Sequence, residues 1–122
     1  MLVLSVVHTK GGVAKTTSAV YLATAAVRRG LSVIVLDADP QGSALLWADA
    51  AERAGDPLPF PVVTADATTM VNPPDADLVI IDTPPGYPAL IDAAIATASA
   101  VLVPTGASPP DPRLADRRRR PL

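Results

Sequence analysis

Short apolar runs alternate with longer segments of mixed character along most of the chain. Residues 2–7 are mainly Leu and Val, and they lead into the pair Gly11-Gly12. Such a run before glycines is typical of a buried strand that enters a tight loop. Residues 31–36 and 78–81 form similar runs, and an aspartate directly follows each of them. The pattern predicts three buried strands, each followed by a polar loop.

The segment after the glycine pair has the spacing of a helix. Over residues 15–29, Val20, Ala23 and Val27 fall on one face, as expected for a helix that packs one side against a sheet. Two arginines occupy its last turn and Gly30 follows them, which is a usual way for a helix to end. The sequence thus predicts a helix that begins at the loop and ends at Gly30.

A second helix is predicted over residues 43–53, with Ser43 as its cap and Gly55 beyond its end. Weaker patterns predict a strand, a helix and a final strand over residues 60–63, 88–98 and 101–103. Strands that alternate with helices are typical of an α/β fold, in which a mostly parallel sheet carries helices on both faces. We therefore expect one α/β domain built on such a sheet.

The composition narrows the class of protein further. Apolar residues make up 49% of the chain but aromatic residues only 3%, so the core has to be built from Ala, Val, Leu and Ile, as suits a buried parallel sheet. The absence of Cys excludes a disulfide scaffold, a thiolate metal site and a cysteine-ligated iron–sulfur cluster. Neither a secretory signal nor a stretch long enough to cross a bilayer is visible. We expect a soluble protein, compatible with a cytoplasmic location.

The formal net charge of −2 conceals an asymmetric distribution. Residues 113–122 contain five Arg and one Asp, whereas all preceding residues together contain five Lys or Arg and eleven Asp or Glu. An acidic body with a short basic tail is not the footprint of a folded nucleic-acid-binding surface. Any contact with DNA is therefore expected to come from the tail or from a partner protein.

Residues 9–17, Thr-Lys-Gly-Gly-Val-Ala-Lys-Thr-Thr, lie between the first predicted strand and the first predicted helix. Ligands of open α/β sheets bind at this position. Glycines let several backbone N–H groups converge on an anion, and the amino end of the next helix adds its positive dipole. Lys15 adds a full charge, and Thr16 offers a hydroxyl to a metal ion that bridges phosphates. The segment predicts a phosphate-binding loop; a Gly-rich turn with lysines nearby is the simpler alternative.

Two aspartate motifs follow at later strand ends. We expect Asp37 to end a strand adjacent to the one that carries the loop, so that its carboxylate can face the water shell of the metal. Asp39 begins the next loop, where it can orient or deprotonate water. Four apolar residues precede Asp82, a pattern typical of a carboxylate that holds magnesium through water or the Thr16 hydroxyl. Each aspartate is also a common loop residue, and only their order after the loop makes the signal strong.

The loop departs from the ordinary P-loop pattern at Thr9 and Ala14, where glycines would be expected, and carries Lys-Gly-Gly-x-x-Lys-Thr-Thr instead. In this form it resembles the deviant Walker A loop of the ParA/MinD family of ATPases. The segment Asp-Ala-Asp-Pro-Gln-Gly is similar to the second motif of ParA-like members, and the strand before Asp82 is similar to their Walker B motif. Residues 83–86 resemble the switch loop of the family. The resemblance covers residues 2–105 and implies a P-loop NTPase fold.

The resemblance also implies residue roles. Lys10 would reach the nucleotide of a partner subunit, Lys15 would hold the phosphates, and Asp39 would handle the attacking water. The residues implied to bind ATP are Lys10, Gly11, Gly12, Val13, Ala14, Lys15, Thr16 and Thr17. Those implied to hold Mg²⁺ are Thr16, Asp37 and Asp82.

The activity implied by this family is slow hydrolysis of Mg-ATP coupled to formation of a homodimer. The chain is most similar to small plasmid-type ParA proteins, which implies partition of plasmid or chromosomal DNA with a ParB-like centromere-binding partner. Non-specific DNA at the nucleoid is a further expected partner, and a membrane is not. Two alternatives stay open: a MinD-like positioning ATPase, although no terminal amphipathic helix is visible, and a truncated nucleotide-binding remnant without turnover.

The expected organisation is a ParA-like nucleotide-binding part, residues 1–105, followed by a Pro- and Arg-rich disordered tail, residues 106–122. Complete family members continue with further strands, which favours a truncated or frameshifted product here. A native basic tail that binds DNA electrostatically is the alternative. Outside the motifs, His8 is expected to be a loop residue, and Leu46 and Trp47 are expected to pack or to line a partner surface.

Overall fold

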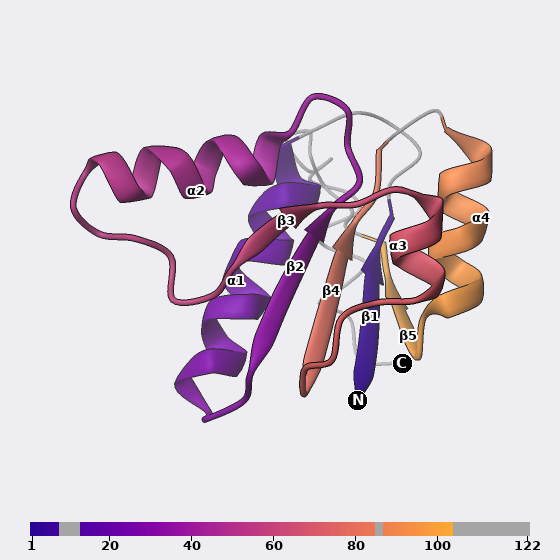
Figure 1. Ribbon diagram of the computed structural model, residues 1–122, viewed down its shortest axis with the longest axis horizontal. Coiled ribbons are helices and arrows are strands. Elements are labelled where there is room, and N and C mark those ends of the chain that lie inside the picture. Colours follow the sequence, from indigo (N-terminus) through magenta and orange to yellow (C-terminus); the bar gives the residue numbers. More distant parts are fainter. Residues whose placement is uncertain (8–12, 85–86, 104–122) are drawn as a thin grey trace, which may run out of the picture.

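A single parallel sheet organises the part of the chain that the computed structural model describes, residues 1–7, 13–84 and 87–103. Its five strands within these ranges are β1 (Leu2–Val6), β2 (Val33–Asp37), β3 (Val62–Thr64), β4 (Leu78–Asp82) and β5 (Ala100–Leu102). They lie in the order β3-β2-β4-β1-β5, and every neighbouring pair is parallel (Figure 1). The predicted parallel α/β sheet is confirmed, and all its carboxyl ends meet at one edge.

β4 lies between β1 and β2 and is hydrogen-bonded to both. The expectation that the strand of Asp37 is adjacent to the strand that leads into the loop is therefore wrong: in register, Asp82 lies between Val6 and Asp37. The physical reason is the burial of β4, all five of whose residues are buried. Four of them are apolar, and such a strand is covered best at the centre of the sheet.

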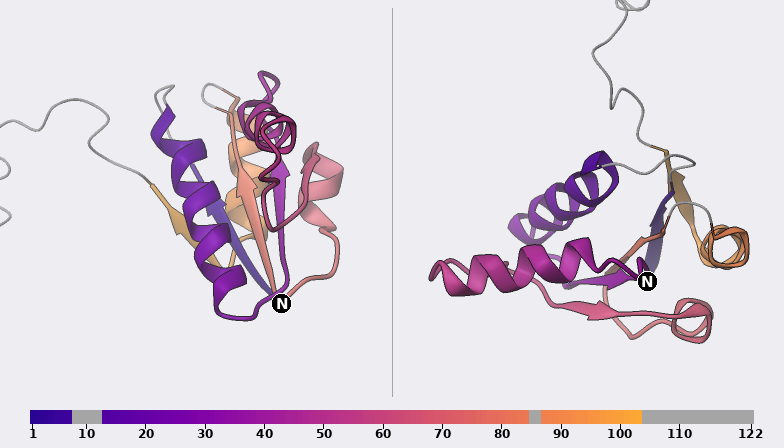
Figure 2. Two further views of the ribbon diagram at one scale, coloured as in Figure 1. Left: turned by 90° about the vertical axis from the view of Figure 1, so that its left-hand side faces the viewer. Right: turned by 90° about the horizontal axis from the view of Figure 1, so that it is seen from above.

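Helices cover both faces of the sheet, as predicted (Figure 2). On one face lie α1 (Val13–Arg28) and α2 (Ser43–Arg53), and on the other lie α3 (Ala67–Val71) and α4 (Pro88–Thr97). None of the helices in the described ranges has both the length and the apolar character needed to cross a bilayer.

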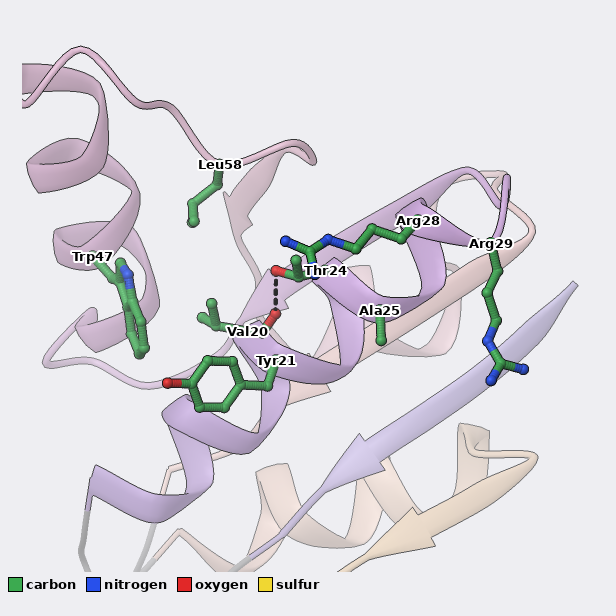
Figure 3. A pocket seen from close by; sticks show the side chains of 8 residues that line it. All are labelled: Val20, Tyr21, Thr24, Ala25, Arg28, Arg29, Trp47 and Leu58. Atoms are coloured by element: carbon green, nitrogen blue, oxygen red, sulfur yellow. Dashed lines mark hydrogen bonds between the residues drawn. The ribbon is translucent and has the colours of Figure 1, made fainter.

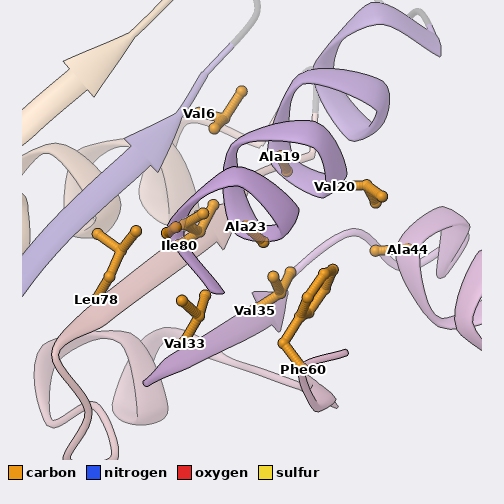
Figure 4. Packing of buried hydrophobic residues seen from close by; sticks show 11 residues of the cluster. Val6, Ala19, Val20, Ala23, Val33, Val35, Ala44, Phe60, Leu78 and Ile80 are labelled. Carbon is orange, nitrogen blue, oxygen red and sulfur yellow. The ribbon is translucent and has the colours of Figure 1, made fainter. Parts of the chain in front are cut away.

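Alternation along the central strands sends neighbouring side chains into two separate cores. Ile80 packs with Val35 and Phe60 beneath α1 and α2 (Figure 4), whereas Ile81 packs with Leu36 on the side of α3 and α4. Among the buried residues of these two clusters, Phe60 is the one aromatic side chain. The prediction of an aliphatic core is confirmed.

Glycines end two of the helices. Gly30 (φ 88°) and Gly55 (φ 78°) have left-handed backbone conformations, and each donates its N–H to the carbonyl three residues earlier. This is the arrangement by which glycine terminates a helix, so both predicted ends are confirmed. The prediction that Ser43 caps the second helix is wrong, because Ser43 is its first residue and the cap position is Gly42 (φ 66°), without a side-chain bond.

The sequence pattern did not predict α3. Asp66 caps this helix of five residues, and its Oδ1 accepts bonds from the backbone N–H (2.9 Å) and the hydroxyl (3.1 Å) of Thr69. These bonds stabilise the charged carboxylate and lower the pKa of Asp66. A helix this short shows no periodicity from which to recognise it. The other predicted elements differ from the observed ones by at most two residues at either end.

Candidate functional site

The carboxyl ends of the three central strands bring three distant parts of the chain together. Val6, Asp82 and Asp37 pair in register across β1, β4 and β2. β1 ends at Val6 and α1 begins at Val13, so the connection between them starts and finishes at this edge of the sheet (Figure 1). A phosphate-binding loop requires this strand-to-helix position.

Part of the predicted site lies outside the described residues. The structure does not describe Lys10, Gly11 and Gly12, nor the side chains of Val13, Ala14 and Lys15. His8 and residues 85–86 of the predicted switch loop also lie outside them, as does the predicted tail. The contacts expected of these residues with phosphate stay predictions. The described residues that can be assessed are Thr16, Thr17, Asp37, Asp39 and Asp82.

The clearest feature of the site is a buried hydrogen bond between Thr16 and Asp82. Thr16 lies in the first turn of α1 and is 5% exposed, and Asp82 ends β4 and is 0% exposed. The Thr16 hydroxyl donates to Asp82 Oδ2 over 3.0 Å. Burial of a carboxylate is costly unless donors or a cation compensate its charge. The structure thus brings together two residues that are 66 positions apart and that were both predicted to hold metal.

The chemistry of this pair fits magnesium. A hydroxyl and a carboxylate are hard oxygen donors, which Mg²⁺ prefers over nitrogen or sulfur. Magnesium in nucleotide sites keeps several waters and is held by one or two carboxylates together with the phosphates. Thr16 and Asp82 supply such a partial set of oxygens at the edge where the connection after β1 begins.

Asp37 has a role that the sequence did not reveal. Its Oδ1 accepts the backbone N–H of Asp39 over 3.0 Å, and its Oδ2 accepts the backbone N–H of Leu45 over 3.1 Å. Leu45 lies in the first turn of α2, where N–H groups lack partners within the helix. The Asp37 carboxylate, 1% exposed, therefore accepts a hydrogen bond from the first turn of α2. The Ser43 side chain was expected to provide this acceptor and does not. No local motif signals this bond, because it joins residues eight apart.

Replacing Asp37 with Ala is expected to lower the free energy of unfolding by about 1–3 kcal/mol, because two partly buried N–H groups lose their acceptor. Urea unfolding without nucleotide or magnesium measures this effect. The matched control is Asp49→Asn on α2, whose exposed carboxylate makes an ion pair with Arg53 and should change stability by less than about 1 kcal/mol. Equal stabilities of the two variants would contradict the role of Asp37 in holding α2.

Asp39 shapes the loop between β2 and α2. Its Oδ1 accepts the backbone N–H of Gln41 over 2.9 Å, and its carbonyl accepts the N–H of Gly42 over 2.9 Å. Such bonds are the usual means by which Asp stabilises a turn. Asp39 is half-buried at the same edge as Asp37, and its expected contact with water stays a prediction.

Thr83 is a further residue of the site that sequence reasoning did not single out by itself. It is fully buried, and both its N–H and its hydroxyl donate to the carbonyl of Val6, over 3.2 and 2.8 Å. These bonds tie the segment after Asp82 to the end of β1. The first residue of the predicted switch loop is thus hydrogen-bonded to the last residue of β1.

The comparison with known families identifies the group to which this fold and site belong. The sequence profile of the family described as the CobQ/CobB/MinD/ParA nucleotide binding domain matches residues 4–105. The chain belongs to this family. The resemblance to ParA/MinD proteins inferred from the loop and the aspartate motifs is confirmed, and the chain is a nucleotide-binding domain of this type.

Curated relatives within the CobQ/CobB/MinD/ParA family carry two kinds of name. The chain is 38% identical over 119 residues to maintenance of carboxysome distribution protein A from Gloeobacter kilaueensis, covering 89% of this chain and 51% of the relative. It is 34% identical over 107 residues to protein ParA from Rhizobium radiobacter, covering 85% of this chain and 48% of the relative. The chain thus spans about half the length of these relatives.

Solved structures agree with the family assignment. Cobyrinic acid a,c-diamide synthase from Mycobacterium smegmatis, with bound ATP analog and magnesium, has a TM-score of 0.66 and 25% identity. The same enzyme with bound ADP and magnesium has a TM-score of 0.65 and 25% identity. Each comparison covers 85% of this chain, and 58% and 59% of the two solved chains.

Proposed function

We propose that this chain binds Mg-ATP at the carboxyl edge of its sheet and acts as a ParA-like ATPase. The observation that carries the proposal is the buried bond between Thr16 and Asp82, located where β1 passes into α1. Similar solved enzymes hold ADP or an ATP analog together with magnesium, which supports the same ligands for this chain.

In this proposal each predicted residue has a distinct task. Lys15 and the backbone N–H groups of residues 10–17 bind the phosphates, because converging donors at a helix amino end favour anions. Thr16 and Asp82 hold magnesium, with Asp37 further along the edge. When bound, magnesium would neutralise phosphate charge and orient the nucleotide. Asp39 accepts a proton from the attacking water or orients it.

The proposed activity is slow ATP hydrolysis coupled to formation of a homodimer, serving partition of DNA with a ParB-like partner and non-specific DNA at the nucleoid. Relatives named protein ParA and chromosome partitioning protein ParA support this choice. We assign the nucleotide-binding part to residues 1–105 and treat residues 106–122 as a tail. A cytoplasmic location follows from the same proposal.

A second candidate is the positioning of a protein cargo. Two relatives are named for maintenance of carboxysome distribution, from Gloeobacter kilaueensis and Halothiobacillus neapolitanus. Both candidates share the nucleotide chemistry and differ only in what the dimer carries. Sedimentation with a centromere-binding protein or with isolated cargo separates the two.

An ATP titration with magnesium, run beside a phosphate-release assay, tests the proposal. Binding with slow release of phosphate is expected. Binding without release would identify a nucleotide-binding module that lacks turnover. Absence of binding by folded protein would contradict the proposal itself.

Replacing Lys10 with Ala is expected to leave ATP affinity unchanged but to abolish the nucleotide-dependent dimer, because Lys10 is proposed to neutralise phosphate charge across the dimer. Sedimentation velocity with ATP and magnesium, and with ADP, measures the effect. Arg53→Ala, on the surface of α2, is the control and should dimerise normally. Unchanged dimers in Lys10→Ala would make Lys10 an ordinary loop residue.

A further inference from the structure

A groove of about 530 Å³ runs between α1, α2 and the segment that leads to β3 (Figure 3). Its lining is mainly apolar, with two arginines at one end. The lining residues are Val20, Tyr21, Thr24, Ala25, Arg28, Arg29, Trp47 and Leu58. These residues lie along α1 from Val20 to just past its end, on α2, and on the segment that leads to β3. Neither Thr16 nor Asp82 is among them, so the groove is separate from that pair.

Two aromatic side chains form one wall of the groove. Tyr21 and Trp47 pack edge to face, with ring centroids 6.4 Å apart and an interplanar angle of 78°. Tyr21 is 67% exposed, so its ring is not part of the core, whereas Trp47 is half-buried and packs against the core cluster beneath α1 and α2. The chain has one Trp, two Tyr and one Phe, and thus half of its aromatic residues face this groove. Exposed aromatics beside an apolar hollow are typical of protein-binding surfaces.

The groove carries positive charge, whereas the residues before the tail carry a net negative charge. Before the tail, the basic residues are Lys10, Lys15, Arg28, Arg29 and Arg53. Two belong to the predicted phosphate loop, and Arg53 pairs with Asp49 over 3.0 Å. Neither Arg28 nor Arg29 makes an ion pair within the described ranges, and the groove lining contains no Asp or Glu. The groove thus presents two exposed positive charges next to apolar surface.

We propose that this groove binds an acidic amphipathic helix of a partner protein. Apolar side chains at helical spacing would pack on Tyr21, Trp47 and Leu58, and carboxylates along the same helix would face Arg28 and Arg29. The chain's own tail fits poorly, because its five arginines would be repelled. A second copy fits poorly as well, because a two-fold contact would place a concave groove against itself and arginines against arginines.

Nucleic acid is less suited to the groove than an acidic helix. Affinity for DNA or RNA comes mainly from many phosphate contacts, and here two arginines stand in an otherwise acidic body. The apolar wall would contribute nothing to phosphate contacts. Binding of such a helix would not require ATP, because no lining residue belongs to the predicted nucleotide site.

Trp47 is the single Trp of the chain, so its intrinsic fluorescence reports binding in the groove without a label. The probes are helical peptides about five turns long that carry Leu along one face and Glu beside it, without aromatic residues. Comparison peptides have Lys in place of Glu, or the same composition in scrambled order. We expect a saturable change in Trp47 emission with the acidic amphipathic peptide and at least about tenfold weaker binding of both comparison peptides.

Charge reversal provides the sharpest test. The double variant Arg28→Glu, Arg29→Glu should lose at least about tenfold in affinity for the Glu peptide and gain affinity for the Lys peptide. Arg53→Glu, an exposed arginine on α2 outside the groove, is the matched control and should bind like the unmodified protein. Tyr21→Ser should weaken every peptide, with an unchanged melting temperature showing that the fold is retained.

Three results would overturn the inference. One is absence of a saturable Trp47 signal with every acidic amphipathic peptide of the panel. Another is equal affinity for the scrambled peptide, which would indicate non-specific adhesion. The third is displacement of the peptide by duplex DNA at stoichiometric concentration, which would identify the groove as a nucleic-acid site.

Discussion

Replacing Lys15 with Ala is expected to abolish binding of Mg-ATP, with affinity lowered by at least about 100-fold. Lys15 lies one residue before Thr16, whose hydroxyl is anchored to Asp82 at the carboxyl edge of the sheet. A full positive charge at the amino end of α1 would be the principal partner of the phosphates, and Ala leaves only backbone donors. Isothermal titration with ATP and magnesium measures the loss.

The fold of the Lys15→Ala variant should be unaffected, since Lys15 lies in α1 and Ala has the highest helix propensity. A far-ultraviolet spectrum and a urea curve that match the unmodified protein provide the control. Magnesium-dependent ATP binding retained at the original affinity would refute the assignment of residues 9–17 as a phosphate-binding loop.

Replacing Asp82 with Asn is expected to remove most of the magnesium dependence of ATP binding, with magnesium bound about 100-fold more weakly. Asn has nearly the same shape and can still accept the bond from Thr16 through its carbonyl oxygen, but it carries no charge. Asp82 is fully buried at the end of β4, so this exchange changes the electrostatics with little change in packing. Titrations with ATP in magnesium and in EDTA give the ratio that reports the effect.

Thr16 offers a matched pair of variants for the same test. Thr16→Ser keeps the hydroxyl that donates to Asp82 over 3.0 Å, whereas Thr16→Val has similar volume and no hydroxyl. Only the Val variant should lose magnesium dependence, and it should also lose about 1–3 kcal/mol of stability because a buried carboxylate oxygen loses its donor. If Asp82→Asn and Thr16→Val both retain the full magnesium effect, these residues do not hold the metal.

Local signals were sufficient to predict most of the elements. Gly30 and Gly55 mark helix ends because only a residue without a side chain adopts a left-handed backbone at low cost. The apolar runs predicted the strands because each of β1, β2 and β4 is covered on both faces. α3 escaped prediction because five residues are fewer than two helical turns.

Non-local features could not be derived in the same way. The placement of β4 between β1 and β2 depends on which strand is buried best once all the helices are present. No local sequence pattern indicates this strand order. The bond from Leu45 to Asp37 likewise depends on how the loop after β2 turns back. The proximity of Thr16 and Asp82 was anticipated from the order of the motifs and not from a local pattern, since 66 positions separate them.

The central position of β4 has a consequence for biosynthesis. Among the described residues, β1 pairs with β4 and β5, and its first partner residue, Leu78, lies 76 positions after Leu2. At ordinary rates of translation, roughly 4–15 s pass between the synthesis of these two residues. During that interval an apolar strand emerges from the ribosome with neither neighbour available, and it is then a natural substrate for chaperones that shield nascent chains.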